Sequence, residues 1–288
     1  GDSSFNVCFA DAAVTITKSG GILNATKFCG DGSCLTNLPS GGFEADDDVN
    51  LMASNTCSGC DLNGSTGCFN VLLGACAGKD VTSGNNNILF GKCAGSSLTT
   101  GDKNVALGIN AMKGGVTTGN LNIVIGQDAG CLLTSGSNNI FLGQCAGRDV
   151  TTGSRNIGIG FRAFSDGTTT AMGNIFLGEY SGMGMTSGAD NVFLGDSAGR
   201  CIETGDHNIG MGKRSLGTGA VTGGCNIAFG CGAGEANTSG KSNIFMGLKA
   251  GCSNLTGHYN VFFGQYAGKS HVCNQGGSGN VYIGKNAG

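Results

Sequence analysis

The sequence is poor in proline, tryptophan and charged residues, and these shortages exclude several classes of protein. Charged residues make up only 12% of the chain, and the net charge is −3. The clustered lysines and arginines of nucleic-acid-binding proteins are missing, so we expect no nucleic-acid partner. No apolar run is long enough to span a bilayer, so we expect no membrane insertion. No signal peptide is recognisable.

Glycine is abundant, with 57 of 288 residues, whereas proline occurs once. Collagen is excluded because it needs glycine at every third position. A disordered linker is excluded because Ile, Val, Leu and Phe recur at fixed places along the chain. We therefore expect an ordered structure that makes use of the glycines.

An internal repeat provides this order, because asparagine followed by Ile or Val begins one unit after another. The spacings are 17, 17 and 18 residues, a triplet that occurs three times before the final 17, 17 and 20. The units begin at Asn70, Asn87, Asn104, Asn122, Asn139, Asn156, Asn174, Asn191, Asn208, Asn226, Asn243, Asn260 and Asn280. If the units stack in register, these asparagines are expected to form a ladder of side-chain amides.

Each unit predicts one short β-strand that ends at a glycine corner. The first residue after Asn and the residue two further on are apolar, which is typical of one face of a strand. A helix would need three- and four-residue spacing, and the glycines would weaken it. The corner position favours positive φ or close backbone approach. The corner glycines are Gly74, Gly91, Gly108, Gly126, Gly143, Gly160, Gly178, Gly195, Gly212, Gly230, Gly247, Gly264 and Gly284.

Units of this length cannot bury a strand face alone, so they are expected to stack. The predicted fold is an all-β parallel β-solenoid, or β-roll fibre, of about 13 coils and roughly 60 Å long at about 4.8 Å per coil. A small residue such as Ala77 follows three positions after each corner glycine, where a larger side chain would collide with a neighbouring coil.

The middle residue, between the two apolar strand positions, is often large and apolar too. If the flanking pair is buried, the middle residue faces outward, and strands that are apolar on both faces are buried on both. We therefore expect the outer face to pack against other copies of the chain, in a homotrimer. The predicted interface residues are Phe141, Phe176, Phe193, Phe245 and Phe262.

Every third unit differs from its neighbours, which gives a super-repeat of 52 residues. The units at Asn104, Asn156 and Asn208 carry Met, Phe or Leu in place of the glycine after the small residue, and their middle residue is Ala or Gly. Threefold geometry would explain three different surroundings. It could arise from winding about a trimer axis or from superhelical contact with neighbours.

Several of the 15 cysteines share a place in the repeat, such as Cys76, Cys93 and Cys145. Buried free thiols are the favoured interpretation, and some disulfides or a metal site are the alternatives. Cys57 and Cys60 have zinc-like spacing, but no second such pair accompanies them. We expect no metal, cofactor or catalytic residues.

The region before Asn70 lacks the repeat. Residues 1–45 are expected to form short strands and loops, residues 46–69 a linker that leads into the shaft, and residues 70–288 the solenoid. The chain ends eight residues after Asn280, partway into a coil, so we expect the shaft to continue beyond it.

Two sequence patterns resemble those of known families. The segment GDGSCLTNLP, from Gly30 to Pro39, is similar to the G-D-G-S-x-L-T-N-L-P element of bacteriophage tail-fibre proteins. The repeats from Asn70 onward resemble the glycine-rich N-[IV]-x-x-G-x-x-A-G arrays in fibre proteins of marine phages, particularly cyanophages. They are more distantly similar to the heads of trimeric autotransporter adhesins.

This resemblance implies a trimeric, elongated virion appendage that reaches toward the host surface. Its partners would be further copies of itself, other tail or fibre proteins, and a host receptor or glycan contacted through a region outside this sequence. The implied location is the virion or the extracellular surface, and the implied role is structural rather than enzymatic.

Three alternatives remain beside the tail-fibre shaft. The first is a trimeric adhesin of a bacterial surface. The second is a glycan-depolymerising tailspike, although the acidic residues are scattered rather than paired, and His207, His258 and His271 lie in turns without a nucleophile motif. The third is an ice-binding solenoid with Thr-Thr arrays, such as Thr99–Thr100, which turn chemistry explains equally well.

Overall fold

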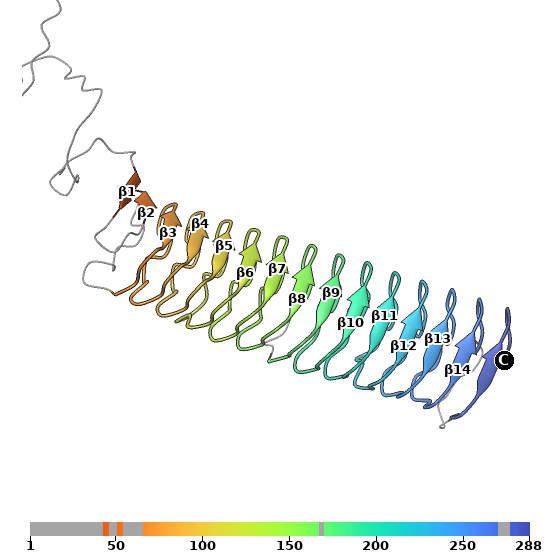
Figure 1. Cartoon of the computed structure of the whole chain (residues 1–288). Helices are drawn as coiled ribbons and strands as arrows, with labels where there is room; N and C mark the ends of the chain where they lie inside the picture. The colour runs from red at the N-terminus through yellow and green to blue at the C-terminus, as the bar shows by residue number, and fades with distance from the viewer. Residues whose placement is uncertain (1–42, 46–50, 54–65, 167–169, 270–276) are drawn as a thin grey trace, which may run out of the picture. The chain divides into compact units, whose positions relative to one another are not determined.

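The computed structural model describes residues 43–45, 51–53, 66–166, 170–269 and 277–288. These residues contain no helix, and their fifteen short strands form one sheet in chain order (Figure 1). The strands are β1 Phe43–Ala45, β2 Leu51–Ala53, β3 Val71–Leu73, β4 Ile88–Phe90, β5 Val105–Leu107, β6 Ile123–Ile125, β7 Ile140–Leu142, β8 Ile157–Ile159, β9 Ile175–Leu177, β10 Val192–Leu194, β11 Ile209–Met211, β12 Ile227–Phe229, β13 Ile244–Met246, β14 Val261–Phe263 and β15 Val281–Ile283.

The predicted parallel β-solenoid is confirmed. Strands β3–β15 run parallel, and each begins one residue after a repeat asparagine. Equivalent residues lie side by side, so that Phe176 of β9 pairs with Phe193 of β10. The sheet extends upstream of residue 70, since β2 pairs in parallel with β3 and in antiparallel fashion with β1. The GDGSCLTNLP segment, Cys57, Cys60 and His271 lie outside the described residues.

The middle residue of each strand from β3 to β15 points into the solenoid, opposite to the prediction. Phe141, Phe176, Phe193, Phe245 and Phe262 are fully buried in the hydrophobic core of a single chain. A side chain enclosed by its own chain cannot contact another copy. The prediction that these phenylalanines form an oligomer interface is therefore wrong.

The repeat asparagines explain this orientation. Each lies two residues before the middle residue, and alternation along a strand places both on the same face. Asn139 and Phe141, for example, are both fully buried. Apolar residues on both faces of the strand cannot themselves show which face is inside. The asparagine shows which face is inside, because Asn139 is fully buried and Phe141 lies on the same face.

The core lies between the sheet and the turns on the opposite side of each coil. Small residues such as Ala77 and Ala94 are fully buried there. Aliphatic residues such as Val81 and Leu98 complete the filling. A coil therefore needs only a few inward side chains, which is why 17 residues suffice for one turn.

The three-coil rhythm has a cause inside the chain. In most coils a large middle residue lies against a glycine, as Phe141 does against Gly147, where a Cβ atom would lie 2.5 Å from the ring. In every third coil the middle residue is small, and a large buried side chain replaces that glycine. The pairs are Ala106 with Met112, Gly158 with Phe164, and Gly210 with Leu216. The core keeps its packing, so the rhythm needs no threefold assembly.

Phe164 shows how closely the exchange reproduces the ordinary coil. Its ring centroid lies 6.2 Å from that of Phe141 and 4.9 Å from that of Phe176. Phe176 continues the column to Phe193, with centroids 6.0 Å apart and the rings nearly parallel. Phe164 thus keeps an aromatic column continuous through a coil whose middle residue is glycine.

The corner glycines adopt a backbone that other residues rarely reach. All thirteen have φ between 121° and 138°. At Gly74 an added Cβ would lie 2.6 Å from the carbonyl oxygen of Gly91 in the next coil. Both the conformation and the close approach of the coils therefore require glycine. The result is a column without side chains beside the strands.

Exchanging the small residue 158 and the large residue 164 within one coil tests the packing of the core. Phe164→Gly should lower the free energy of unfolding by about 3–5 kcal/mol because it leaves a cavity. Gly158→Phe should also destabilise, because its ring would compete with Phe164 for one space. The double variant restores the arrangement of Phe141 with Gly147 and should recover most of the loss. Denaturant unfolding of the wild type, the two single variants and the double variant measures the coupling between residues 158 and 164. A stability loss in the double variant equal to the sum of the two single losses would contradict the exchange.

Candidate functional site

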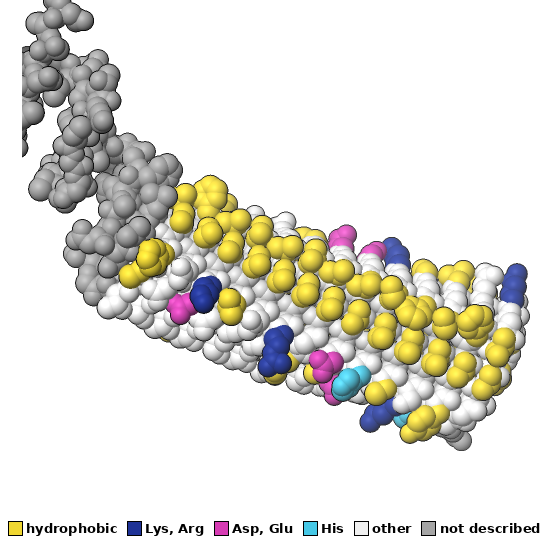
Figure 2. All heavy atoms as spheres, viewed as in Figure 1, with side chains coloured by type: hydrophobic (Ala, Val, Ile, Leu, Met, Phe, Trp, Pro, Cys, Tyr) yellow, Lys and Arg dark blue, Asp and Glu magenta, His cyan; other side chains and the backbone are white. Residues whose placement is uncertain are grey.

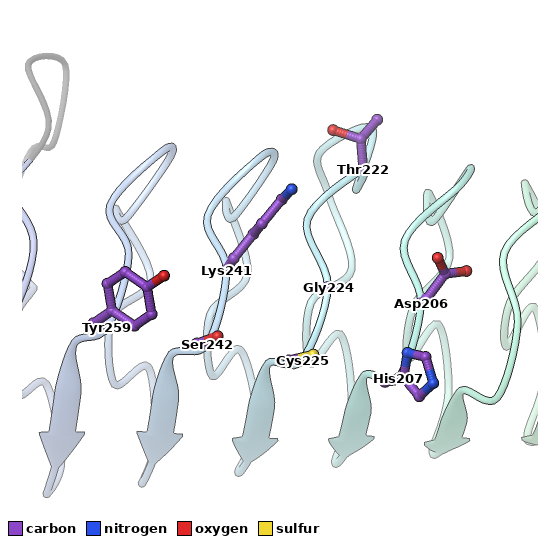
Figure 3. A pocket seen from close by; sticks show the side chains of 8 residues that line it. All are labelled: Asp206, His207, Thr222, Gly224, Cys225, Lys241, Ser242 and Tyr259. Atoms are coloured by element: carbon purple, nitrogen blue, oxygen red, sulfur yellow. The ribbon is translucent and has the colours of Figure 1, made fainter.

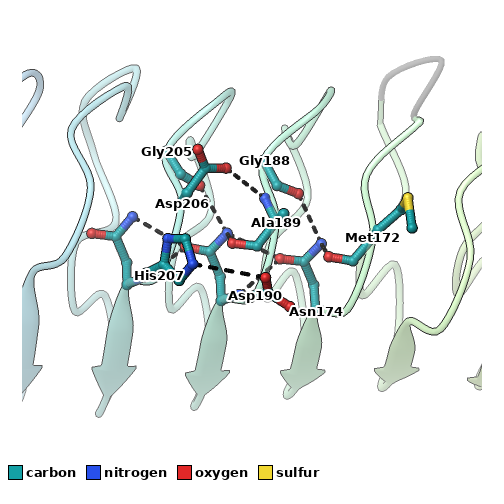
Figure 4. Close-up of polar contacts among 10 residues, drawn as sticks. Met172, Asn174, Gly188, Ala189, Asp190, Gly205, Asp206 and His207 are labelled. Atoms are coloured by element: carbon teal, nitrogen blue, oxygen red, sulfur yellow. Dashed lines mark hydrogen bonds and ion pairs between the residues drawn. The ribbon is translucent and has the colours of Figure 1, made fainter.

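The side chain of the asparagine that begins each coil is hydrogen-bonded to the equivalent asparagine of the next coil. Oδ1 of Asn174 accepts hydrogen bonds from Nδ2 and from the backbone N of Asn191, at 2.9 and 3.0 Å (Figure 4). Nδ2 of Asn174 donates to Oδ1 of Asn156 at 3.1 Å and to the carbonyl of Gly188 at 2.9 Å. Twelve amide-to-amide bonds of this kind link Asn70 to Asn280.

The amide ladder saturates its own side chains. An interior Oδ1 accepts two hydrogen bonds and Nδ2 donates two, which is the full capacity of the amide group. The asparagines from Asn70 to Asn260 are fully buried, so water does not compete for these bonds. A coil shifted by one residue would leave buried amides unpaired, at a cost of about 1–3 kcal/mol each. The ladder therefore fixes the register of the coils.

A second, interrupted ladder lies at the surface, two residues before many of the repeat asparagines, where Asn, Asp, Ser or His side chains accept a backbone N–H of the preceding coil. Oδ1 of Asp102 accepts the backbone N–H of Asn85 at 2.7 Å, and His258 Nδ1 accepts that of Lys241 at 3.0 Å. Asp206 Oδ1 accepts the backbone N–H of Ala189 at 2.7 Å. Sequence reasoning missed this role, although the recurrence of Asn, Asp and Ser at this position indicates it. His258 is half-buried and bonds to the coils on both sides of it.

A hollow of about 250 Å³ lies along this surface ladder (Figure 3). It is lined by Asp206, His207, Thr222, Gly224, Cys225, Lys241, Ser242 and Tyr259. His207, Cys225, Ser242 and Tyr259 each directly precede a repeat asparagine, so they stand one coil apart in a row. All four side chains are exposed to solvent.

The acidic partner of His207 is held loosely. His207 Nε2 lies 3.8 Å from Asp190 Oδ2, too far for a hydrogen bond, and both side chains are largely exposed. Across the described residues, no three His, Cys, Asp or Glu side chains gather where they could hold a metal ion.

Ion pairs connect neighbouring coils elsewhere on the surface. Arg162 lies 2.8 Å from Asp166, and Arg148 of the preceding coil lies 3.4 Å from the same carboxylate. Burial raises the pKa of Asp166, but the hydrogen bonds from Arg162 and Ser165 outweigh it and hold that pKa below its usual value. Such partly exposed pairs contribute about 0–1 kcal/mol each, so they supplement the ladders rather than replace them.

The cysteines differ from their prediction. The nine described cysteines are free thiols, and each is half-buried or exposed rather than fully buried. Cys76, Cys93 and Cys145 adopt left-handed φ values of 57–59° beside the glycine corner, so they sit in the turn rather than among the core residues. Burial, together with the Asp128 carboxylate, raises the pKa of Cys131 above its usual value. The prediction of fully buried thiols is therefore wrong for these residues.

The first and third residues of strands β3–β15 point outward and form what we call the outer strand face. All of them are Val, Ile, Leu, Phe or Met. The exposed fraction is 58% for Phe90, 52% for Phe263 and 70% for Ile283. Figure 2 shows hydrophobic rows along the solenoid, with charged side chains beside the rows rather than among them. This continuous apolar surface is the main candidate for contact with another molecule.

An interior asparagine and the last asparagine of the amide ladder allow a direct test of its contribution. Asn139→Ala removes a fully buried amide, leaves groups of Asn156 and Gly153 unpaired, and leaves Asn122 Oδ1 with only the backbone N–H of residue 139. We expect a loss of about 1–3 kcal/mol or more. Asn280→Ala should cost less, because that side chain is only partly buried and water can replace its bonds. Denaturant melting of both variants measures the difference, and equal, negligible losses would contradict a stabilising ladder.

The chain matches no protein-family model, no curated protein and no solved structure. In the part of the chain that the structure describes, no helix is long and apolar enough to cross a membrane. A proposal of function therefore depends on the sequence patterns, the ladders and the outer strand face described above.

Proposed function

We propose that this chain is the structural shaft of a fibrous appendage, specifically of a virion tail fibre that supports attachment to a host surface. The observation that carries the proposal is the unbroken amide ladder from Asn70 to Asn280, together with the parallel strands β3–β15. A stack in which every coil is bonded to the next in one fixed register behaves as a rod. A rod is what an appendage needs to hold a binding tip away from a particle.

The dimensions suit this role. Thirteen coils at about 4.8 Å each give a length of roughly 60 Å. Length in a solenoid grows by adding coils that contact only their neighbours, so the same repeat can extend further without a new core. The resemblance of the GDGSCLTNLP segment and of the repeats to phage fibre proteins gives the proposal its specific form.

The surface chemistry favours a structural role over an enzymatic one. Glycan cleavage uses two carboxylates that face one substrate. Here Asp166, Asp196 and Glu235 each lie 2.8 Å from a cationic side chain, that of Arg162, Lys213 or Arg214. These carboxylates are therefore engaged in ion pairs, and those of Asp196 and Glu235 join neighbouring coils.

The threonines argue against an ice-binding role. Several turn hydroxyls donate to the carbonyl oxygen of the next coil, as Thr134 does to Thr151 at 3.0 Å and Thr238 to Leu255 at 2.8 Å. A hydroxyl used along the stack is less able to order water at the surface. The recurrent threonines therefore serve the stacking of turns.

The proposed setting follows from the same resemblance. The shaft would be a homotrimer, joined to other tail or fibre proteins at the virion or at an extracellular surface. Contact with the host receptor or glycan would be made by a region outside this sequence. The shaft itself would position that region.

Immunoelectron microscopy tests this assignment. Antibodies raised against the purified chain should decorate filaments that project from virions, and they should block adsorption of those virions to host cells. Small-angle scattering of the chain should give a rod with a long dimension of at least about 60 Å. Labelling confined to the particle interior, or release of sugars from host glycans by the purified chain, would contradict a shaft.

A further inference from the structure

The outer strand face is uniformly apolar over its whole length. Two residues from each of thirteen strands contribute to it, and none of these side chains is polar or charged. Many are well exposed: Ile88, Phe90, Ile123, Ile125 and Met211 have exposed fractions between 37% and 58%. Random surface positions in a protein with this composition would include polar residues. The uniformity indicates a face that is covered in the assembled protein.

The size of this face matches what a stable association needs. It is about 60 Å long and roughly 10 Å wide with its side chains, so it projects to about 600 Å² and presents a larger accessible area. Contiguous apolar patches on soluble monomers seldom exceed about 300–600 Å². Specific interfaces bury about 800 Å² per partner. The face therefore lies at the limit for a free monomer and in the range of a standard interface.

The shape of the face restricts its occupant. Parallel strands in register present side-chain rows that repeat at about 4.8 Å, and the neighbouring corner-glycine column adds no side chain that would hold a partner off. A compact globular partner would cover only part of such a strip. Another solenoid with the same coil spacing can cover all of it.

The charge distribution points in the same direction. The chain has a net charge of −3 and its outer strand face carries no charge, so two copies approach without strong repulsion. A partner recognised by charge would need cations or anions among the apolar rows. Figure 2 shows charged groups only beside the rows. Apolar sheets pack face to face at about 10 Å in just this manner.

We propose that the outer strand face is the self-association surface of this chain, and that its occupant is the outer strand face of other copies. The inference rests on the proposed shaft function in that it names the shaft's partner, but it replaces the phenylalanines first assigned to this role. Burial of the Ile, Val, Leu, Phe and Met side chains supplies the driving force. Bundling of solenoids would also stiffen the rod.

Charge introduced at the centre of the face tests the proposal. The full chain should sediment as an oligomer with a mass that is a multiple of 28.6 kDa. A variant with Ile140→Lys, Leu142→Lys, Ile175→Lys and Leu177→Lys should raise the dissociation constant at least about 100-fold, because association would bury charges without partners. Sedimentation equilibrium across a concentration series measures this change.

A matched control separates the face from a general effect of charge. Ser135→Lys, Thr152→Lys, Ser187→Lys and Thr204→Lys add the same charge at exposed turn positions of the same region, and the dissociation constant should stay unchanged. A third variant carries Ile140→Thr, Leu142→Thr, Ile175→Thr and Leu177→Thr. Threonine favours β-strands, so this variant is less prone to misfold than the lysine variant. It should weaken association by a smaller factor, with an unchanged circular dichroism spectrum.

Two results would overturn the proposal. One is a wild-type chain that remains a monomer at about 100 μM, a concentration well above the dissociation constants that are typical of a specific interface of this area. The other is an oligomer that the strand-face and turn variants weaken equally. Neither result bears on the antibody decoration of virion filaments, so failure of this surface is distinguishable from failure of the shaft assignment.

Discussion

The hydrogen bonding of one asparagine to the next along the stack is the interaction on which this structure depends. Each coil contributes one three-residue strand, and a strand that short gives little register by itself. The buried amides provide the register, since a single-residue slip would leave both donors and acceptors unpaired in the core. The surface ladder that includes Asp102 and His258 repeats the same device on the outside.

Because the register is fixed, successive coils have to fill a core of constant cross-section. In one arrangement the middle strand residue is large and the residue after the small turn residue is glycine. In the other arrangement the middle strand residue is small and the later residue is large. Phe141 with Gly147 is one solution, and Gly158 with Phe164 is the other. Both keep aromatic rings in contact from coil to coil, so a regular rod tolerates an irregular sequence. The 52-residue rhythm reflects the alternation of these solutions.

The same geometry determines what the surface can do. Charged side chains such as Lys213 and Asp196 form pairs between neighbouring coils, turn threonines bond along the stack, and exposed side chains line the hollow near His207. The outer strand face remains as an extended apolar surface with no partner within the described chain. In the proposed shaft, this face would be covered by further copies of the chain.

The sequence by itself determined the architecture. Thirteen asparagines at spacings near 17 residues, followed by short apolar segments and an invariant glycine, allow only stacked parallel strands. The need for an amide ladder and for positive φ at positions such as Gly74 also followed from the pattern, because repetition places equivalent residues in line.

Only the tertiary structure decided which strand face is inside. Phe141 and its equivalents alternate with Ile140 and Leu142, and since all are apolar, hydrophobicity could not distinguish the faces. The decision came from contacts between positions that are distant along the unit: Asn139 bonds within the stack, and turn residues such as Gly147 leave room for the middle ring. The burial of the thiols was also decided by the tertiary structure, because turn geometry, not composition, placed Cys76 and Cys93 toward the surface. Periodicity determines which residues stack, but the closing of each coil determines which of them are enclosed.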